Sequence, residues 1–246
     1  IYGMFTSAMI DPLPKSQREF LAVMGLADEF TIEMAEFVTD NPDVEKILSR
    51  LTAQNAFVKR LPDGSTYRFH HMMKECASRV FQMLEKEKQS FYQKRFALWY
   101  EEHKQYLHTL NAYRQSEDYD RLLRIIQKDA GILLSSLNPD AVLSVIDNCP
   151  ASTLKEHPLS LLVLMRSMFN WNRFPKIMEM RSLLMASIEE HTEMSAKERG
   201  NLLGECDLIM SFLCYNDISA MSRLHRSASN QMSRPAISIH KSGGWT

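Results

Sequence analysis

The chain has 246 residues, 45% hydrophobic and 24% charged, values typical of a globular protein with room for one large domain or two smaller ones. Its 29 basic and 30 acidic side chains leave a formal net charge of −1, which argues against a surface built mainly to hold nucleic-acid phosphates. No signal peptide opens the sequence, and the longest apolar run, residues 159–165, is too short to span a bilayer. We therefore expect a cytoplasmic location and no membrane partner.

Three helices are predicted before residue 56. Ser16 and Glu19 have capping-box spacing, in which the serine oxygen accepts a hydrogen bond from the backbone N–H of Glu19 and the glutamate reaches back. Thr31 is a suitable N-cap for the second helix, and Asn41-Pro42 starts the third, with Pro at the first helical position. The apolar residues of the third helix recur at i, i+3, i+4 and i+7, namely Val44, Ile47, Leu48 and Leu51.

A β-hairpin is predicted next, because the apolar period changes from 3.6 to 2 at Phe57. Its strands, at residues 57–61 and 66–69, are joined by Pro62-Asp63-Gly64-Ser65, in which Gly is free to take a positive φ. A further helix is expected from His71 to Leu84. Three helices followed by a hairpin and a packed helix is the order of a winged-helix domain, which we place at residues 1–86.

From residue 87 onward only helical signals occur. Polar turns that introduce an apolar residue recur at 117–119, 172–174 and 216–218, irregular intervals that fit a degenerate array of helical hairpins. We therefore predict a mostly α fold in which the winged helix is followed by an α-α superhelical, tetratricopeptide-like array at residues 87–230. A second capping box at residues 195–198 opens one of its helices. Since residue 1 is not Met, we expect a fragment of a longer protein, with residues 231–246 a linker or a truncated end.

No catalytic motif is present in the sequence: it has no phosphate-binding glycine loop, no G-x-S-x-G elbow and no H-E-x-x-H pair. His71 and Glu75 would share a helical face next to His70, but no third metal ligand is near them in sequence. We expect no catalytic residues, no metal site and no enzymatic activity in this part of the chain. The four scattered cysteines are typical of reduced core thiols: Cys76, Cys149, Cys206 and Cys214.

The winged helix could read DNA or face another protein, and its charges favour the second role. Lys59 and Arg60 on the wing are basic, but two residues make a weak grip on phosphates. The helix that would enter a major groove is nearly balanced in charge, with Asp43, Glu45, Lys46 and Arg50.

The methionines of the second half also allow two interpretations. They could line an adaptable groove for a ligand or fill the core, and core filling is favoured. The residues concerned are Met165, Met168, Met178, Met180, Met185 and Met194.

Several segments resemble MalT-type bacterial regulators, large LuxR-family proteins among the signal-transduction ATPases with numerous domains. The resemblance is most specific around the hairpin, and it extends diffusely into the second half. Its residues are Asp11-Pro12-Leu13-Pro14, Gln17-Arg18-Glu19-Phe20-Leu21, Phe30-Thr31, Ile47-Leu48, Asn55-Ala56-Phe57-Val58, Tyr67-Arg68-Phe69-His70-His71, Asp147-Asn148-Cys149-Pro150, His157-Pro158-Leu159 and Trp171-Asn172-Arg173-Phe174.

The resemblance implies that an ATPase domain precedes this region and that a helix-turn-helix domain, the part that binds DNA, follows it. In related switches, a Met-His-Asp motif at the hairpin-to-helix junction touches the β-phosphate of ADP. Phe69-His70-His71 occupies that place, with Phe for Met and His for Asp. The resemblance therefore makes His70 the candidate cofactor-binding residue, acting on ATP or ADP only in the full-length protein. A histidine at a helix N-terminus suits a phosphate, while the simpler interpretation is that His70 caps the helix.

Two functional hypotheses follow. In the first, the chain is the central regulatory and sensor portion of a LuxR-family, MalT-like transcriptional regulator. Its partners are then its own nucleotide-binding domain and a small-molecule inducer or regulatory protein on the helical repeats. In the second, it is a stand-alone helical-repeat scaffold that recruits a protein. A phosphate loop and a helix-turn-helix encoded on either side would distinguish the first from the second.

Overall fold

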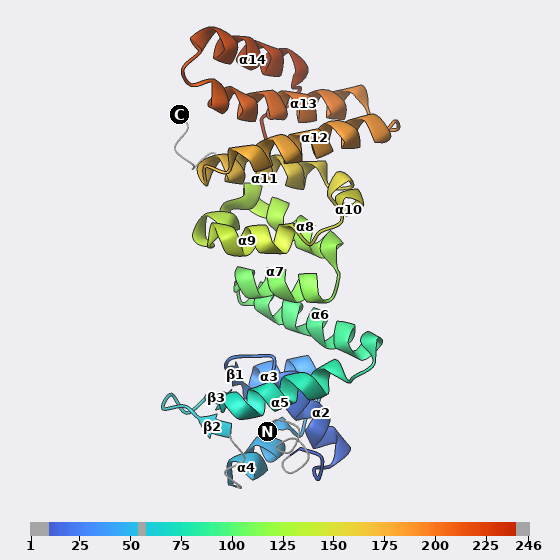
Figure 1. Ribbon diagram of the computed structural model, residues 1–246, viewed down its shortest axis with the longest axis vertical. Helices are drawn as coiled ribbons and strands as arrows, with labels where there is room; N and C mark the ends of the chain where they lie inside the picture. Colours follow the sequence, from blue (N-terminus) through green and yellow to red (C-terminus); the bar gives the residue numbers. More distant parts are fainter. Residues whose placement is uncertain (1–9, 54–57, 240–246) are drawn as a thin grey trace. The chain divides into compact units, whose positions relative to one another are not determined.

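The fold is mostly helical and divides into two compact units, residues 1–117 and 118–246 (Figure 1). The computed structural model describes residues 10–53 and 58–239. Among these residues, no helix combines the length and hydropathy needed to cross a membrane.

The first unit has the element order of a winged helix, followed by two more helices. Its elements are α2 (Lys15–Met24), β1 (Phe30–Thr31), α3 (Ile32–Thr39), α4 (Val44–Ala53), β2 (Val58–Arg60), β3 (Thr66–Phe69), α5 (His71–Gln82), α6 (Lys86–Glu102) and α7 (Tyr106–Gln115). The predicted hairpin and the helix after it are confirmed. The predicted strand position Phe57 lies outside the described residues.

The sheet has one strand more than the sequence predicts. Strand β1 pairs antiparallel with β3, with Phe30 opposite Tyr67, and gives the strand order β1-β3-β2. The Phe30 ring packs against those of Tyr67 and Phe69, with ring centroids 6.1 and 5.2 Å apart. A strand of two residues shows no alternation in sequence, so only its pairing identifies it.

The helix starts of the first unit are partly as predicted. Thr31 caps α3, since its Oγ1 accepts a hydrogen bond from Met34 N at 3.1 Å, and the predicted stripe of α4 is buried. The Ser16 capping box is wrong: α2 begins at Lys15, and its N-cap, Pro14, makes no side-chain bond. The third helix begins at Val44, two residues later than predicted, because the Asn41 side chain accepts from Asp43 N and holds a turn there.

Helix α6 packs against the winged helix. Arg95 Nε donates to the carbonyl of Phe37 on α3 at 2.7 Å, and the Phe37 and Trp99 rings lie 5.6 Å apart. Both α6 and α7 fall within the first compact unit, and the start of the helical array at residue 87 stays a prediction.

Over its described residues, 118–239, the second unit contains helices and no strand. They are α8 (Tyr119–Gln127), η1 (Lys128–Ser136), α9 (Pro139–Ile146), α10 (Ala151–Lys155), α11 (Pro158–Asn170), α12 (Phe174–Glu190), α13 (Ala196–Ser211), η2 (Phe212–Cys214) and α14 (Ile218–Gln231). The pairs α11–α12 and α13–α14 are helical hairpins, as the predicted array requires (Figure 1).

The polar turns mark helix starts, as predicted. Asp118, Ser195 and Asp217 each accept a hydrogen bond from a first-turn amide of the helix that follows, at 3.3, 3.1 and 2.8 Å. In the 172–174 turn, Asn172 takes a left-handed φ of 57° and Arg173 N donates to Met168 O at 2.8 Å. These turns reverse the chain between helices.

The core of the second unit contains three of the six methionines considered for a groove. Met165, Met168 and Met180 are at most 1% exposed, which confirms core filling for these three. Met178, by contrast, is 47% exposed. Across the chain, Cys76, Cys149 and Cys206 are buried free thiols, and burial raises the pKa of Cys149 and of Cys206 to about 11.

Candidate functional site

The junction between β3 and α5 places His70 at a helix N-terminus. Phe69 ends the strand and is buried, while His70 is exposed and takes an extended conformation. The His70 Nδ1 accepts from Met72 N at 3.4 Å, so the imidazole is the N-cap of α5. The capping interpretation is therefore confirmed, and the nucleotide contact stays a prediction.

The loop before β1 is tied to both sides of this junction by ion pairs. Glu29 pairs with Arg68 on β3, and Asp28 pairs with Lys74 on α5. The hydrogen bond from Lys74 holds the pKa of the Asp28 carboxyl below its ordinary value. The first turn of α5 contains no acidic residue, so the amides at this N-terminus are compatible with an anion.

The histidine pair does not assemble a metal site with its neighbours. His71 Nε2 lies 4.0 Å from Glu75 Oε1, the i, i+4 geometry expected of a shared helical face. Within residues 10–53 and 58–239, no three His, Cys, Asp or Glu side chains are grouped to hold a metal ion.

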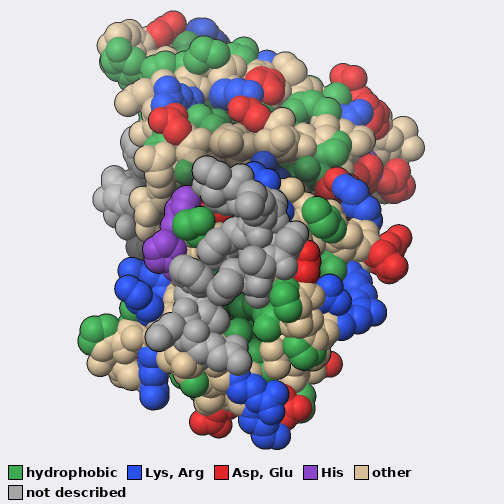
Figure 2. All heavy atoms as spheres, turned by 60° about the horizontal axis from the view of Figure 1, so that its bottom comes forward, with side chains coloured by type: hydrophobic (Ala, Val, Ile, Leu, Met, Phe, Trp, Pro, Cys, Tyr) green, Lys and Arg blue, Asp and Glu red, His purple; other side chains and the backbone are tan. Residues whose placement is uncertain are grey.

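Two basic residues of the wing region, Lys46 and Arg60, are engaged in local contacts. Lys46 on α4 bonds Asp43 at 2.6 Å, which lowers the pKa of the Asp43 carboxyl. On the wing, Arg60 Nε donates to Gly64 O at 2.6 Å, and its guanidinium lies 6.0 Å from the centre of the Tyr67 ring. Figure 2 shows basic and acidic side chains interspersed on this face. These local contacts occupy two of the side chains that a phosphate would need, and whether the winged helix faces protein stays a prediction.

The second unit contains an open, mostly aromatic hollow of about 620 Å³. The Phe169 ring lies 5.4 Å from that of Phe212 and 6.3 Å from that of Phe174. Phe174 is 45% exposed and Tyr215 72%, so large apolar surface faces solvent here. We call this site the aromatic hollow; its lining is Phe169, Asn170, Asn172, Phe174, Phe212, Leu213 and Tyr215.

A second hollow, of about 680 Å³, lies between α9, α10 and α12. Lys176, in its lining, forms ion pairs with Asp147 at 2.8 Å and with Glu179 at 2.9 Å. The charged side chains of this hollow are therefore paired with one another. The aromatic hollow, with apolar walls and two side-chain amides, has the character of a small-molecule site.

The sequence did not predict the aromatic hollow as a site. One signal was present in the sequence, because the polar turn at residues 172–174 introduces Phe174, a large apolar residue of the lining that is left exposed in the structure. The hollow itself depends on α11, α12 and η2 meeting in space, which no pattern within one segment expresses.

Comparison with known proteins finds a family model that is similar to part of the first unit. A family model described as the MalT winged helix domain matches residues 6–89. The HTH-type transcriptional regulator AlkS of Alcanivorax borkumensis is 22% identical over 116 residues, which cover 47% of this chain. The matched region spans 13% of that regulator's length. No solved structure matches the chain.

Proposed function

We propose that the chain is the central regulatory and sensor portion of a LuxR-family, MalT-like, ATP-dependent transcriptional regulator. The match of residues 6–89 to the MalT winged helix domain carries this proposal, and the similarity to a transcriptional regulator supports it. The ATPase and DNA-binding domains belong to the longer protein. The winged helix holds the nucleotide-binding domain in its ADP-bound state, and an inducer or protein partner on the helical hairpins releases that contact.

In this mechanism, His70 senses the β-phosphate of ADP. The imidazole stands at the N-terminus of α5, beside backbone amides whose dipoles favour an anion. While Nδ1 accepts the cap hydrogen bond from Met72 N, the Nε2–H on the other side of the ring is the group that donates to the phosphate. Two roles of His70, capping α5 and contacting the nucleotide, must therefore be separated by experiment.

The substitutions His70→Asn and His70→Ala separate them. Asn is among the best N-cap residues, so His70→Asn keeps the cap and removes the imidazole, whereas His70→Ala removes both. In the longer protein that includes the nucleotide-binding domain, we expect both variants to weaken ADP retention about tenfold, or about 1.4 kcal/mol. Retention is measured as the ADP that remains bound after gel filtration.

His71→Ala is the matched control, because His71 is the exposed neighbour of His70 and does not occupy the cap position. Its ADP retention should equal that of the unsubstituted protein. If His70→Asn also retains ADP normally, His70 is only a cap and its sensor role is lost.

The aromatic hollow is the surface we assign to an inducer. Ligand sites in proteins are concave and mainly apolar, with volumes of roughly 300–1,000 Å³ and a few polar groups that fix orientation. The hollow has this character, with Asn170 and Asn172 as its amides. An apolar or aromatic small molecule is the class of ligand that suits it.

The fluorescent dye 1-anilinonaphthalene-8-sulfonate tests whether the hollow accepts such a molecule. We expect Phe174→Ser and Tyr215→Ser to weaken dye binding several-fold, because each removes an exposed aromatic wall. Phe91→Ser is the control, since Phe91 is a comparably exposed ring (49%) in the first unit. Equal loss in all three variants, or no loss, would exclude the hollow as a binding site.

A further inference from the structure

Glu205 on α13 is a completely buried carboxylate that accepts hydrogen bonds from three residues of the segment 233–238, which we call the strap. Its Oε1 accepts from Arg234 Nη1 at 2.6 Å and from Ile237 N at 3.0 Å. Its Oε2 accepts from Ser238 N at 2.8 Å and Ser238 Oγ at 2.6 Å. A buried carboxylate is tolerated when donors surround it in this way, and it is strongly unfavourable without them.

One helical turn earlier, Asn201 holds the start of the strap. Its Oδ1 accepts from Ser233 N at 2.8 Å and from Ser233 Oγ at 3.3 Å. Asn201 and Glu205 lie at i and i+4, so they share one face of α13. Together they accept three backbone N–H groups of the strap, a pattern that recognises an extended peptide largely through its main chain.

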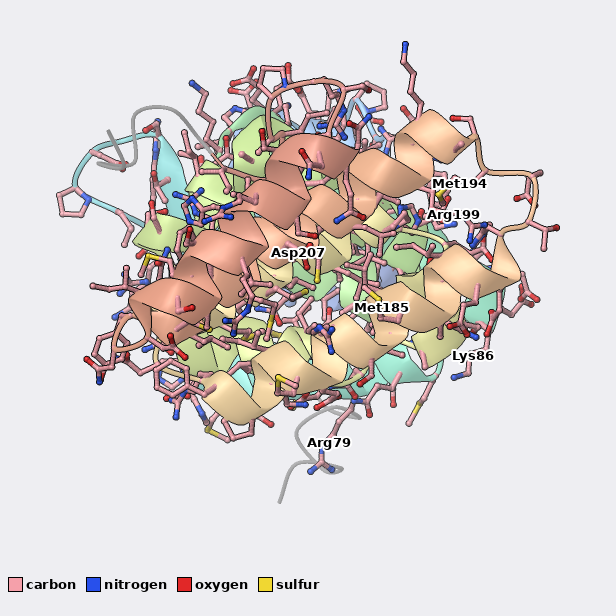
Figure 3. The ribbon with its side chains drawn as sticks, turned by 90° about the horizontal axis from the view of Figure 1, so that it is seen from above. Arg79, Lys86, Met185, Met194, Arg199 and Asp207 are labelled. Atoms are coloured by element: carbon pink, nitrogen blue, oxygen red, sulfur yellow. The ribbon has the colours of Figure 1, made fainter. Side chains whose placement is uncertain are left out.

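Two glycines of α13, Gly200 and Gly204, lie where the chain just before the strap approaches the helix closely. A Cβ on Gly200 would lie 2.6 Å from the carbonyl oxygen of Gln231, and one on Gly204 would lie 2.3 Å from Met232 Cγ. These distances leave no room for a side chain, so the glycines allow the chain to lie close to the helix. Nearby, Asp207, labelled in Figure 3, accepts from the Gln231 side chain at 3.0 Å.

The strap itself has no helix or strand, and it reaches a second helix at its far end. The carbonyl of Ser238 accepts from Arg166 Nη1 on α11 at 3.4 Å. Ser238 is 1% exposed, whereas Ile237 beside it is 47% exposed. The strap is therefore held through the side chains of Arg234 and Ser238 and through its main chain, while the side chain of Ile237 is partly exposed to solvent.

The sequence predicts a linker or truncated end over residues 231–246. Within the described part of that segment, residues 233–238 contact α13 and α11, and its role as a linker or truncated end stays a prediction. Nothing in the sequence of this segment predicts its contact with the buried carboxylate of Glu205, because Glu205 lies about 30 residues earlier in the chain.

We propose that the face of α13 formed by Asn201, Gly204 and Glu205 is a peptide-binding site, and that the strap is a detachable ligand held there in cis. The partner it fits is an extended segment with an arginine and, four residues later, a serine. This inference goes beyond the proposed function, because it depends only on contacts inside the second unit. Since a tethered ligand has an effective concentration on the order of millimolar, a partner peptide binds only when the strap is undocked.

The test uses the intact chain and a fluorescently labelled peptide with the sequence of residues 231–239. In one variant, Arg234→Ala and Ser238→Ala are combined, which removes the two side chains of the strap that bind Glu205. We expect the peptide to bind this variant at least about tenfold more tightly than the unsubstituted chain, in which the strap competes. A peptide with Ala at both positions, or addition of Glu205→Gln to the variant, should abolish binding.

Folding of the variant is followed by circular dichroism and thermal unfolding. If the folded variant does not bind the peptide, or the unsubstituted chain binds it equally well, the proposal is overturned. If the variant does not fold, the peptide added in trans should restore its helical signal and its unfolding transition. Failure to restore them would also overturn the proposal.

Discussion

At the scale of single residues, Glu19 shows how a local pattern can be redirected by a distant contact. Its spacing from Ser16 predicts a capping box, yet Glu19 Oε1 accepts from Lys88 Nζ and Tyr92 Oη on α6, both at 2.9 Å. Burial works to raise the pKa of the Glu19 carboxyl, but these two hydrogen bonds outweigh it and hold that pKa below its ordinary value of 4.5. Burial and Glu19 raise the pKa of Tyr92 to about 12.

This pKa shift predicts an acid-sensitive link between α2 and α6. A carboxyl whose pKa is lowered by folding stabilises the folded state above its unfolded pKa, near 4.5, and loses that contribution as the pH falls through the folded value. We expect Glu19→Gln to be less stable than the unsubstituted chain near neutral pH, and the difference to shrink below pH 4.5. Thermal unfolding at both pH values measures it.

Glu45→Gln is a matched control, because Glu45 is an exposed carboxylate on α4. Its stability should track that of the unsubstituted chain at both pH values. A Glu19→Gln variant whose deficit is the same in acid as at neutral pH would show that the carboxylate charge is not what links the helices.

At the scale of elements, prediction succeeded where a segment contains its own periodic signal. The hairpin alternates with period 2, α4 has a four-residue apolar stripe, and α8, α13 and α14 each begin at a capping residue. Strand β1 was missed because two residues contain no period, and it exists through its pairing with β3. The packing of α6 on α3 through Arg95 and Trp99 joins segments far apart in sequence, and no local pattern expresses it.

At the scale of the whole molecule, the two units divide the proposed tasks between them. The first unit contains His70 and the residues that match the MalT winged helix domain, and the second contains the aromatic hollow and the strap. The chain spans only 13% of the AlkS regulator, so the activity of the longer protein is part of the proposal.

The complete gene provides the test at this scale. We expect it to encode a glycine-rich phosphate loop upstream of residue 1 and a helix-turn-helix downstream of residue 246, because a nucleotide switch needs the first and a DNA-binding regulator needs the second. Reading the gene sequence checks this. A gene that encodes neither would remove the regulator proposal and leave the protein-binding scaffold.

The sequence by itself determined the fold class, the winged helix and most helix starts, because periodicity and capping are properties of neighbouring residues. It also singled out His70, whose position as a helix N-cap is local. Only the tertiary structure decided which residues bond Glu19, where the aromatic hollow forms and where the strap lies. Each depends on side chains from different elements, and a buried carboxylate such as Glu205 is stable only where the fold brings donors from 29 or more residues away to surround it.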